Sequence, residues 1–190
     1  VSNSGTRRFT TEQYSKSVSL WLGSEEPSLD FELSNSGAVT EQTVEKLASA
    51  ANVIASQRSD TLTNFLRCKS RRKAKERECV TEFVETFGRT VFRRPLDLEE
   101  KDWLMGLYDT LLPELEFDDT ASTLIEIILQ SPQALYVNEV GLEQSGLEEG
   151  VRALDGFERA TRLALFLWGK APNNTLLDYA KESRLSTKAG

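Results

Sequence analysis

The sequence predicts an all-α fold, an irregular multi-helix bundle of about seven to nine helices joined by long loops. Two observations support this prediction. Apolar residues recur at helical spacing along most of the chain, and polar residues that favour helix starts precede these runs. In addition, no segment shows the sustained alternation of apolar and polar residues that is typical of a half-buried strand.

Residues 1–67 are expected to form an N-terminal helical region. Residues 10–13 (Thr-Thr-Glu-Gln) fit a capping box, and the helix that follows should end at Gly23. A long loop over 24–38 comes next, in which three alternating apolar residues allow a short extended piece: Leu29, Phe31 and Leu33. A second helix should begin near Thr40, and a short third one should cover residues 60–67. The expected apolar face of the second helix consists of Val44, Leu47, Ala51 and Ile54.

Residues 68–137 are expected to form a central helical domain. Its first helix carries an apolar stripe at helical spacing, made by Val80, Phe83, Val84, Phe87 and Val91. Pro95 prevents this helix from continuing. The next helix should start at Asp97, with Glu100 completing the cap, and its expected apolar face comprises Trp103, Leu104, Leu107, Tyr108 and Leu111. A further helix, capped by Asp118 or Asp119, should break near Pro132.

The last part of the chain predicts a change of domain. Residues 138–153 contain three glycines and several glutamates, which is typical of a surface connection, and 154–190 read as the start of a further helical domain. Asp155 with Glu158 caps a helix there, and Gly169 ends it. The expected apolar face of that helix comprises Phe157, Ala160, Leu163, Ala164, Leu167 and Trp168. Asn174 should begin a last helix.

Composition excludes several kinds of site. The chain has no histidine, which rules out Ser-His-Asp and Cys-His catalysis and histidine metal or haem ligation by its own residues. A net charge of −7 argues against general nucleic-acid binding. No apolar run is long enough to span a bilayer, so we expect no transmembrane segment. Acidic residues stand where helix caps belong, and we predict no catalytic, metal or cofactor site, although composition alone permits two-carboxylate glycosidase chemistry.

Two basic clusters are candidate interaction or architectural sites. Arg71, Arg72 and Lys73 lie in a basic run that suits an anionic partner or, alternatively, a solvated loop. Arg89, Arg93 and Arg94 precede Pro95 and suit either a bidentate clamp on a carboxylate or phosphate, or a helix end paired with an acidic residue of the following helix. The candidates for that pairing are Glu99 and Glu100. The two cysteines, Cys68 and Cys79, allow either a disulfide or two reduced thiols.

Three stretches together resemble a group of exported proteins typical of planctomycetes and myxobacteria. The stretches are residues 7–23, residues 87–96 with 129–136, and residues 154–172. Proteins of this group are built from consecutive domains of unknown function and are often linked to cytochrome c-like domains. The sequence departs from the group's pattern at Ala164-Leu165 and at Asn173, and members of the group extend beyond the equivalent of Gly190.

The resemblance implies a location and a role. It places the chain in the periplasm or at the cell surface, with membrane association allowed, where an oxidising environment favours a Cys68–Cys79 bridge. It implies a non-catalytic structural or protein-interaction module, an accessory subunit of a larger assembly with a c-type cytochrome as a candidate partner. The alternative is a fragment of an extracellular hydrolase or oxidoreductase whose active site lies outside this chain.

Overall fold

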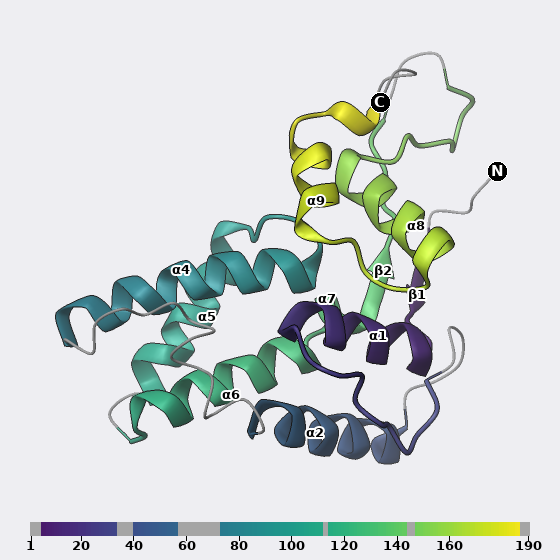
Figure 1. Ribbon diagram of the computed structural model, residues 1–190. Coiled ribbons are helices and arrows are strands. Elements are labelled where there is room, and N and C mark those ends of the chain that lie inside the picture. The colour runs from purple at the N-terminus through teal and green to yellow at the C-terminus, as the bar shows by residue number, and fades with distance from the viewer. Residues whose placement is uncertain (1–4, 34–39, 57–72, 112–113, 144–146, 187–190) are drawn as a thin grey trace. The chain divides into compact units, whose positions relative to one another are not determined.

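The computed structural model describes residues 5–33, 40–56, 73–111, 114–143 and 147–186. Within these ranges the structure has eight α-helices and one small sheet, which confirms the predicted predominantly helical fold (Figure 1). The short helix expected over 60–67 lies outside the described residues. Among the helices that are described, none combines the length and the apolar character needed to cross a membrane.

The chain divides into two compact units, residues 1–38 with 135–190 and residues 39–134. This grouping differs from the consecutive regions expected from the sequence, 1–67, 68–137, 138–153 and 154–190. The difference arises because segments from the two ends of the chain are bonded to each other. For example, the backbone N–H of Ala171 donates to Oγ of Ser17 over 2.9 Å.

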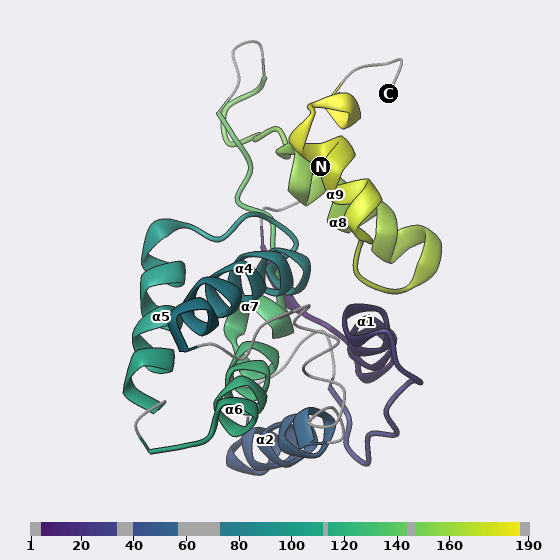
Figure 2. The same cartoon turned by 60° about the vertical axis from the view of Figure 1, so that its left-hand side comes forward.

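The first unit contains the small sheet and three α-helices. Its elements are β1 (Thr6–Arg8), α1 (Thr11–Leu22), β2 (Tyr136–Asn138), α8 (Gly156–Trp168), α9 (Asn174–Lys181) and the 3-10 helix η2 (Arg184–Ser186). Strands β1 and β2 pair antiparallel with Arg7 opposite Val137, an element that the sequence patterns do not predict because each strand has three residues. Helices α8 and α9 lie side by side in Figures 1 and 2 and share a small core of Ala160, Ala164, Leu176 and Ala180.

Helix α1 begins as its capping box predicts. Thr10 accepts from the backbone of Gln13, whose side chain accepts from the backbone of Thr10 in return, and Gly23 ends the helix with φ 61°. The loop that follows is fixed to this helix start. Oγ1 of Thr11 donates to the carbonyl of Phe31 and accepts from the backbone N–H of Leu33, so the alternating apolar residues are held as an irregular segment rather than a strand.

The second unit consists of packed helices. Its elements are α2 (Glu41–Ser56), α4 (Lys73–Phe92), α5 (Leu98–Leu111), α6 (Phe117–Gln130) and α7 (Pro132–Leu135, whose last residue belongs to the first unit). Figures 1 and 2 show α2 lying along α6, and α4 packs on α5 and α6. The core contains the stripe expected on α4 together with apolar residues of α5 and α6, namely Leu104, Tyr108, Leu124, Ile125, Ile128 and Leu129.

Three details of the helices predicted for this second unit are wrong. Helix α6 begins at Phe117 after Glu116, earlier than a cap at Asp118 or Asp119 would place it. Trp103 is expected in the core but is 52% exposed, because α5 turns Leu104, Met105 and Tyr108 inward instead. Val44 is exposed as well, at the start of α2, whereas its expected partners on the apolar face are buried.

Candidate functional site

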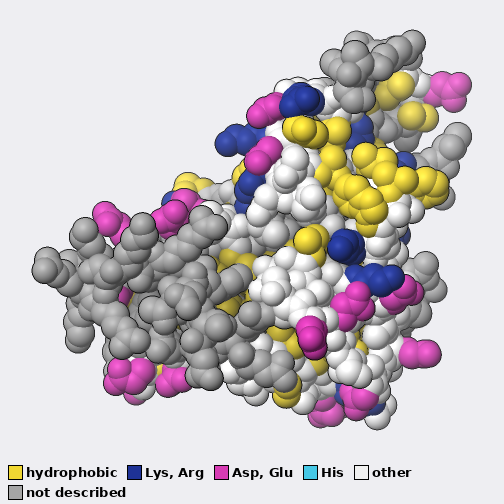
Figure 3. Space-filling view, viewed as in Figure 1, with side chains coloured by type: hydrophobic (Ala, Val, Ile, Leu, Met, Phe, Trp, Pro, Cys, Tyr) yellow, Lys and Arg dark blue, Asp and Glu magenta, His cyan; other side chains and the backbone are white. Residues whose placement is uncertain are grey.

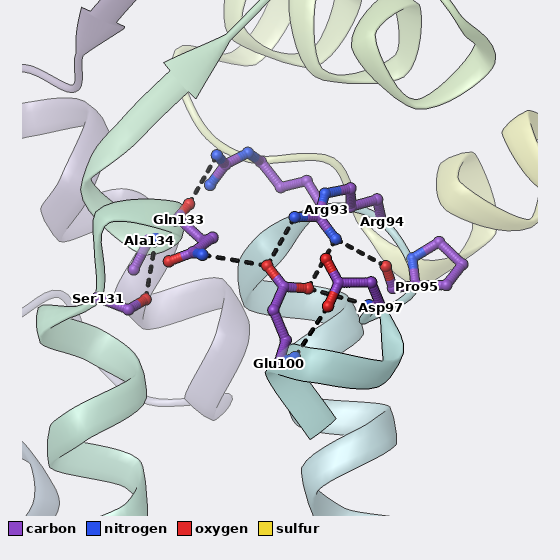
Figure 4. A network of polar contacts seen from close by, with 8 residues as sticks. All are labelled: Arg93, Arg94, Pro95, Asp97, Glu100, Ser131, Gln133 and Ala134. Carbon is purple, nitrogen blue, oxygen red and sulfur yellow. Dashed lines mark hydrogen bonds and ion pairs between the residues drawn. The ribbon is translucent and has the colours of Figure 1, made fainter. Parts of the chain in front are cut away.

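The end of helix α4 brings Arg93 and Arg94 into a polar network (Figure 4). The helix stops at Phe92 for two reasons. Arg93 adopts the left-handed conformation with φ 61°, a position usually taken by glycine, and Pro95 cannot donate a backbone hydrogen bond. The chain then turns directly into α5.

Arg93 is buried and its guanidinium points inward. Its Nη1 donates to the carbonyl of Val91 over 2.9 Å, and its Nη2 donates to the carbonyl of Gln133 over 2.8 Å. The first bond satisfies a carbonyl of the last turn of α4, which has no partner within the helix. The second ties the end of α4 to α7, forty residues further along the chain.

Arg94 forms a two-pronged ion pair with Glu100 at the start of α5. Its Nη1 lies 2.8 Å from Oε2 and its Nη2 lies 2.7 Å from Oε1, the bidentate geometry that suits a carboxylate. Gln133 Nε2 donates to the same Oε1 over 3.0 Å. Asp97 and Glu100 also exchange side-chain and backbone hydrogen bonds as a capping box, so the carboxylate serves the helix start and the network together.

The environment of Glu100 favours its ionised form. Its side chain is 13% exposed, and this burial by itself raises the pKa. The hydrogen bonds from Arg94, from the backbone of Asp97 and from Gln133, with the charge of Arg94, outweigh burial and hold the pKa of Glu100 below its ordinary value.

This arrangement is suited to holding helices, not to chemistry. The Glu100 carboxylate accepts four hydrogen bonds, about as many as its lone-pair sites can take, so it is not poised to transfer a proton or ligate a metal. Within the described residues, no group of three His, Cys, Asp or Glu side chains is placed to hold a metal ion. The network joins the ends of α4, α5 and α7 at a fixed geometry.

The remaining candidates from the sequence are only partly described. Cys68, Arg71 and Arg72 lie outside the described residues, so the Cys68–Cys79 bridge and the basic run stay predictions. Lys73 is the first residue of α4, and Cys79 is half-buried on the same helix. Arg89 lies half-buried in the last turns of α4, one turn before Arg93.

A second candidate site is an apolar surface on α8, made by Leu163, Phe166, Leu167 and Trp168 and called here the α8 surface. The exposed fractions of these residues are 40%, 84%, 55% and 46%, respectively. Figure 3 shows hydrophobic side chains gathered over this helix. Three of these residues are expected in the core from the sequence, but α8 buries Ala160, Thr161, Ala164 and Leu165 instead. Exposed apolar clusters on soluble domains commonly mark interaction sites.

The start of α8 is rigidly fixed, which positions this surface. Glu158 is part of the capping box with Asp155, as predicted, and its Oε1 also accepts from the backbone N–H groups of Val140 and Gly141. Arg162 pairs with Glu139, one of the residues that lead into the same connection. Polar contacts therefore fix the N-terminal half of α8, while its C-terminal half presents exposed apolar side chains.

Sequence reasoning misses Gln133 and Phe166. Nothing in the pattern around Gln133 distinguishes it from an exposed glutamine. For Phe166 a signal is present, because residues 163–168 form an unbroken apolar run, Leu-Ala-Leu-Phe-Leu-Trp. Such a run places apolar side chains all around the last turns of a helix, more of them than a single packed face can bury.

Two family models match consecutive parts of the chain. Residues 79–139 match PSD5, described as a protein of unknown function (DUF1595), and residues 154–190 match PSD4, described as a protein of unknown function (DUF1592). The chain thus carries two successive segments that are similar to domains of unknown function. The first segment includes the whole Arg93–Arg94–Glu100–Gln133 network, and the second includes the α8 surface. The comparisons with curated proteins and with solved structures found no match.

Proposed function

We propose that this chain is a non-catalytic protein-interaction module that docks a partner through the α8 surface. The observation that carries the proposal is the exposure of Phe166, Leu167 and Trp168 on a helix whose start is held by polar anchors. An isolated exposed apolar residue needs no explanation, whereas a cluster of aromatic and aliphatic side chains on one rigid helix has the composition of an interface core.

The network at the end of α4 supports the same proposal from the other unit. The polar groups of Arg93, Arg94 and Glu100 are bonded to other groups of the same chain, and these bonds hold the helix ends together. The second unit therefore has helix ends fixed by polar contacts, and the first unit presents an exposed apolar surface, two features that suit a docking subunit.

We place this module in an exported protein of the cell envelope, as an accessory subunit of a larger assembly in which a c-type cytochrome is a candidate member. The resemblance of three stretches to exported proteins supports this placement, and the matches to two consecutive domains of unknown function agree with the domain organisation of that group. In the oxidising envelope, Cys68 and Cys79 are proposed to form a disulfide.

Native mass spectrometry of the protein gently released from its own cell envelope tests the proposal. We expect the wild type to leave with a defined partner and the Phe166→Ser variant to leave alone. Leu98→Ser is the matched control, because Leu98 is an exposed apolar residue on a helix of the other unit. A partner that stays bound to Phe166→Ser would refute docking through the α8 surface.

A denaturing measurement on the same sample tests the bridge. The chain should gain about two mass units on reduction if Cys68 and Cys79 are joined, one hydrogen for each sulfur. An unchanged mass would show two thiols and would refute the proposed Cys68–Cys79 bridge.

A further inference from the structure

We infer that the partner presents to the α8 surface an amphipathic helix whose apolar stripe is flanked by acidic residues. This inference rests on the proposed docking function and names the chemistry of its partner. It is carried by the spacing of the exposed residues, by the charges beside them and by the limited area that they offer.

The spacing matches that of a helix-packing surface. Leu163, Phe166 and Leu167 stand at positions i, i+3 and i+4 of α8, so they form one ridge along the helix, whereas Trp168 follows Ala164 by four residues and ends the helix on another side. The face that contains Ala160 and Ala164 is already packed on α9. A ridge of this kind fits the groove between side chains of a second helix, and helices that bind in this mode anchor through residues at the same spacing.

The charges beside the ridge are basic in an otherwise acidic chain. Between residues 159 and 177 there are three basic residues, Arg159, Arg162 and Lys170, and no acidic residue, whereas the whole chain carries −7. Arg159 precedes Leu163 by one helical turn, and Lys170 follows Phe166 by four residues. Glu139 pairs with Arg162, so the local excess comes chiefly from two other residues. They are Arg159, whose guanidinium donates to the backbone carbonyls of Asp155 and Leu185, and Lys170, which follows the end of the helix.

These charges disfavour a second copy of the chain as the occupant. In a two-fold symmetric dimer through this helix, the same basic residues would meet across the interface. The apolar area is also small, on the order of 450 Å² for four partly exposed side chains, against about 800 Å² per partner in a stable interface. A short acidic helix instead adds attraction between opposite charges to this modest apolar contact.

An anionic membrane fits less well than an acidic helix. Attraction to anionic lipid headgroups usually requires four to eight clustered basic residues, and the ridge has three of them in a chain of net charge −7. One of the three, Arg162, is engaged with Glu139.

The test uses two synthetic helical peptides of equal length that share a leucine stripe at i, i+3, i+4 and i+7. One carries glutamates and the other lysines beside the stripe, and binding to the full chain is measured by fluorescence anisotropy of the labelled peptides. We expect the glutamate peptide to bind about tenfold more tightly at low salt and the preference to shrink at high salt. Phe166→Ser should weaken binding of the glutamate peptide about tenfold, and Leu98→Ser should leave it unchanged. Lys170→Glu should reduce the preference for glutamate.

Other outcomes would overturn the inference. Equal or tighter binding of the lysine peptide, or binding that does not depend on Phe166, refutes the acidic-helix partner. Binding to vesicles of anionic phosphatidylglycerol that is lost in Phe166→Ser would assign the surface to a membrane. Self-association that is lost in the same variant, measured by sedimentation, would assign it to a second copy. If Phe166→Ser loses its envelope partner but the peptides show no preference, the docking function stands and only the partner chemistry fails.

Discussion

The C-terminal ends of α4 and α8 share a local design and differ in what surrounds them. Each helix carries apolar residues up to its last turn, and each ends at a residue in the left-handed conformation, Arg93 with φ 61° and Gly169 with φ 63°. At the end of α4 the apolar stripe is buried and Arg93 reaches inward to carbonyl groups. At the end of α8 the apolar residues are exposed, and a Cβ at Gly169 would meet no atom within 4 Å.

The difference shows that the residues that follow a helix help to decide whether its last apolar side chains are buried. They do so through the contacts that they make with other helices. Arg93 and Arg94 reach α7 and α5, which ties three helix ends together, and α5 and α6 pack on α4 and cover its apolar stripe. The buried face of α8 meets α9 mainly through alanines, which lets the two helices approach closely but covers only that face. The stripe of α4 therefore belongs to a core, and the ridge of α8 remains available to a partner.

Replacing Arg93 should have the largest effect on stability. Arg93→Ala leaves the carbonyls of Val91 and Gln133 without their donors in a buried place, so we expect a loss of about 2–5 kcal/mol in the free energy of unfolding. Arg93→Gly should lose about 1 kcal/mol less, because glycine adopts φ 61° without steric cost. Chemical denaturation of the three proteins measures both effects. Equal stability of wild type and Arg93→Ala would show that the network does not hold the helices.

A substitution that widens the contact between α8 and α9 should have the next largest effect on stability. A Cβ at Gly156 would lie 2.8 Å from the carbonyl oxygen of Ala180, a backbone atom that cannot move aside easily. Gly156→Ala should therefore lower the free energy of unfolding by about 1–3 kcal/mol. Gly106 on α5 is the matched control, since a Cβ there meets nothing within 4 Å, and Gly106→Ala should stabilise by about 0.5–1 kcal/mol. Destabilisation by both changes, or by neither, would contradict this account of the close approach.

Much of the fold follows from local signals in the sequence. The capping boxes at Thr10 and Asp155 are present as predicted, because a cap involves residues three positions apart and needs no tertiary contact. The pairing of β1 with β2 could not be predicted, since two three-residue strands more than a hundred residues apart carry no periodic signal. The start of α6 differs from its predicted position because Glu116, which precedes it, makes no side-chain cap.

The candidate site was less predictable, for a physical reason. The spacing of Arg93, Arg94 and the acidic residues after Pro95 indicates a paired helix end, yet Gln133 joins the network from a distant segment that local patterns cannot locate. On α8 the periodic pattern identifies apolar residues without saying whether the fold covers them. The sequence pattern predicts that both Leu163 and Ala164 are buried. In the structure Ala164 packs on α9 and is buried, whereas Leu163 is exposed.

The carboxylate of Glu100 should make stability depend on pH. Its pKa is lowered in the folded state, so the unfolded chain binds more protons as pH falls below the ordinary value of 4.5. The stabilisation is therefore present above about that pH and is lost as the pH falls through the folded-state pKa. Glu100→Gln should cost about 1–2 kcal/mol at neutral pH and should lose stability less steeply than the wild type between about pH 5 and 3.

Urea denaturation at several pH values measures this difference, with Glu99→Gln as the control. Glu99 is exposed in the same first turn of α5, and we expect its variant to follow the pH profile of the wild type. Identical profiles for Glu100→Gln and the wild type would show that the ion pair with Arg94 adds nothing to the folded state.

Replacing Phe166 should have the smallest effect on stability, although its effect on partner binding should be the largest. Phe166 is 84% exposed, so Phe166→Ser removes little buried apolar surface and should change the free energy of unfolding by no more than about 0.5 kcal/mol. The neighbouring Leu165 is buried, and Leu165→Ser should lose about 2–5 kcal/mol. Thermal or urea unfolding of the isolated chain distinguishes the two. If Phe166→Ser destabilises the chain as much as Leu165→Ser does, Phe166 belongs to the core of this unit and the α8 surface is not a docking site. If it does not, the exposed ridge has no role in the stability of the isolated chain, and its apolar residues are left to serve a partner.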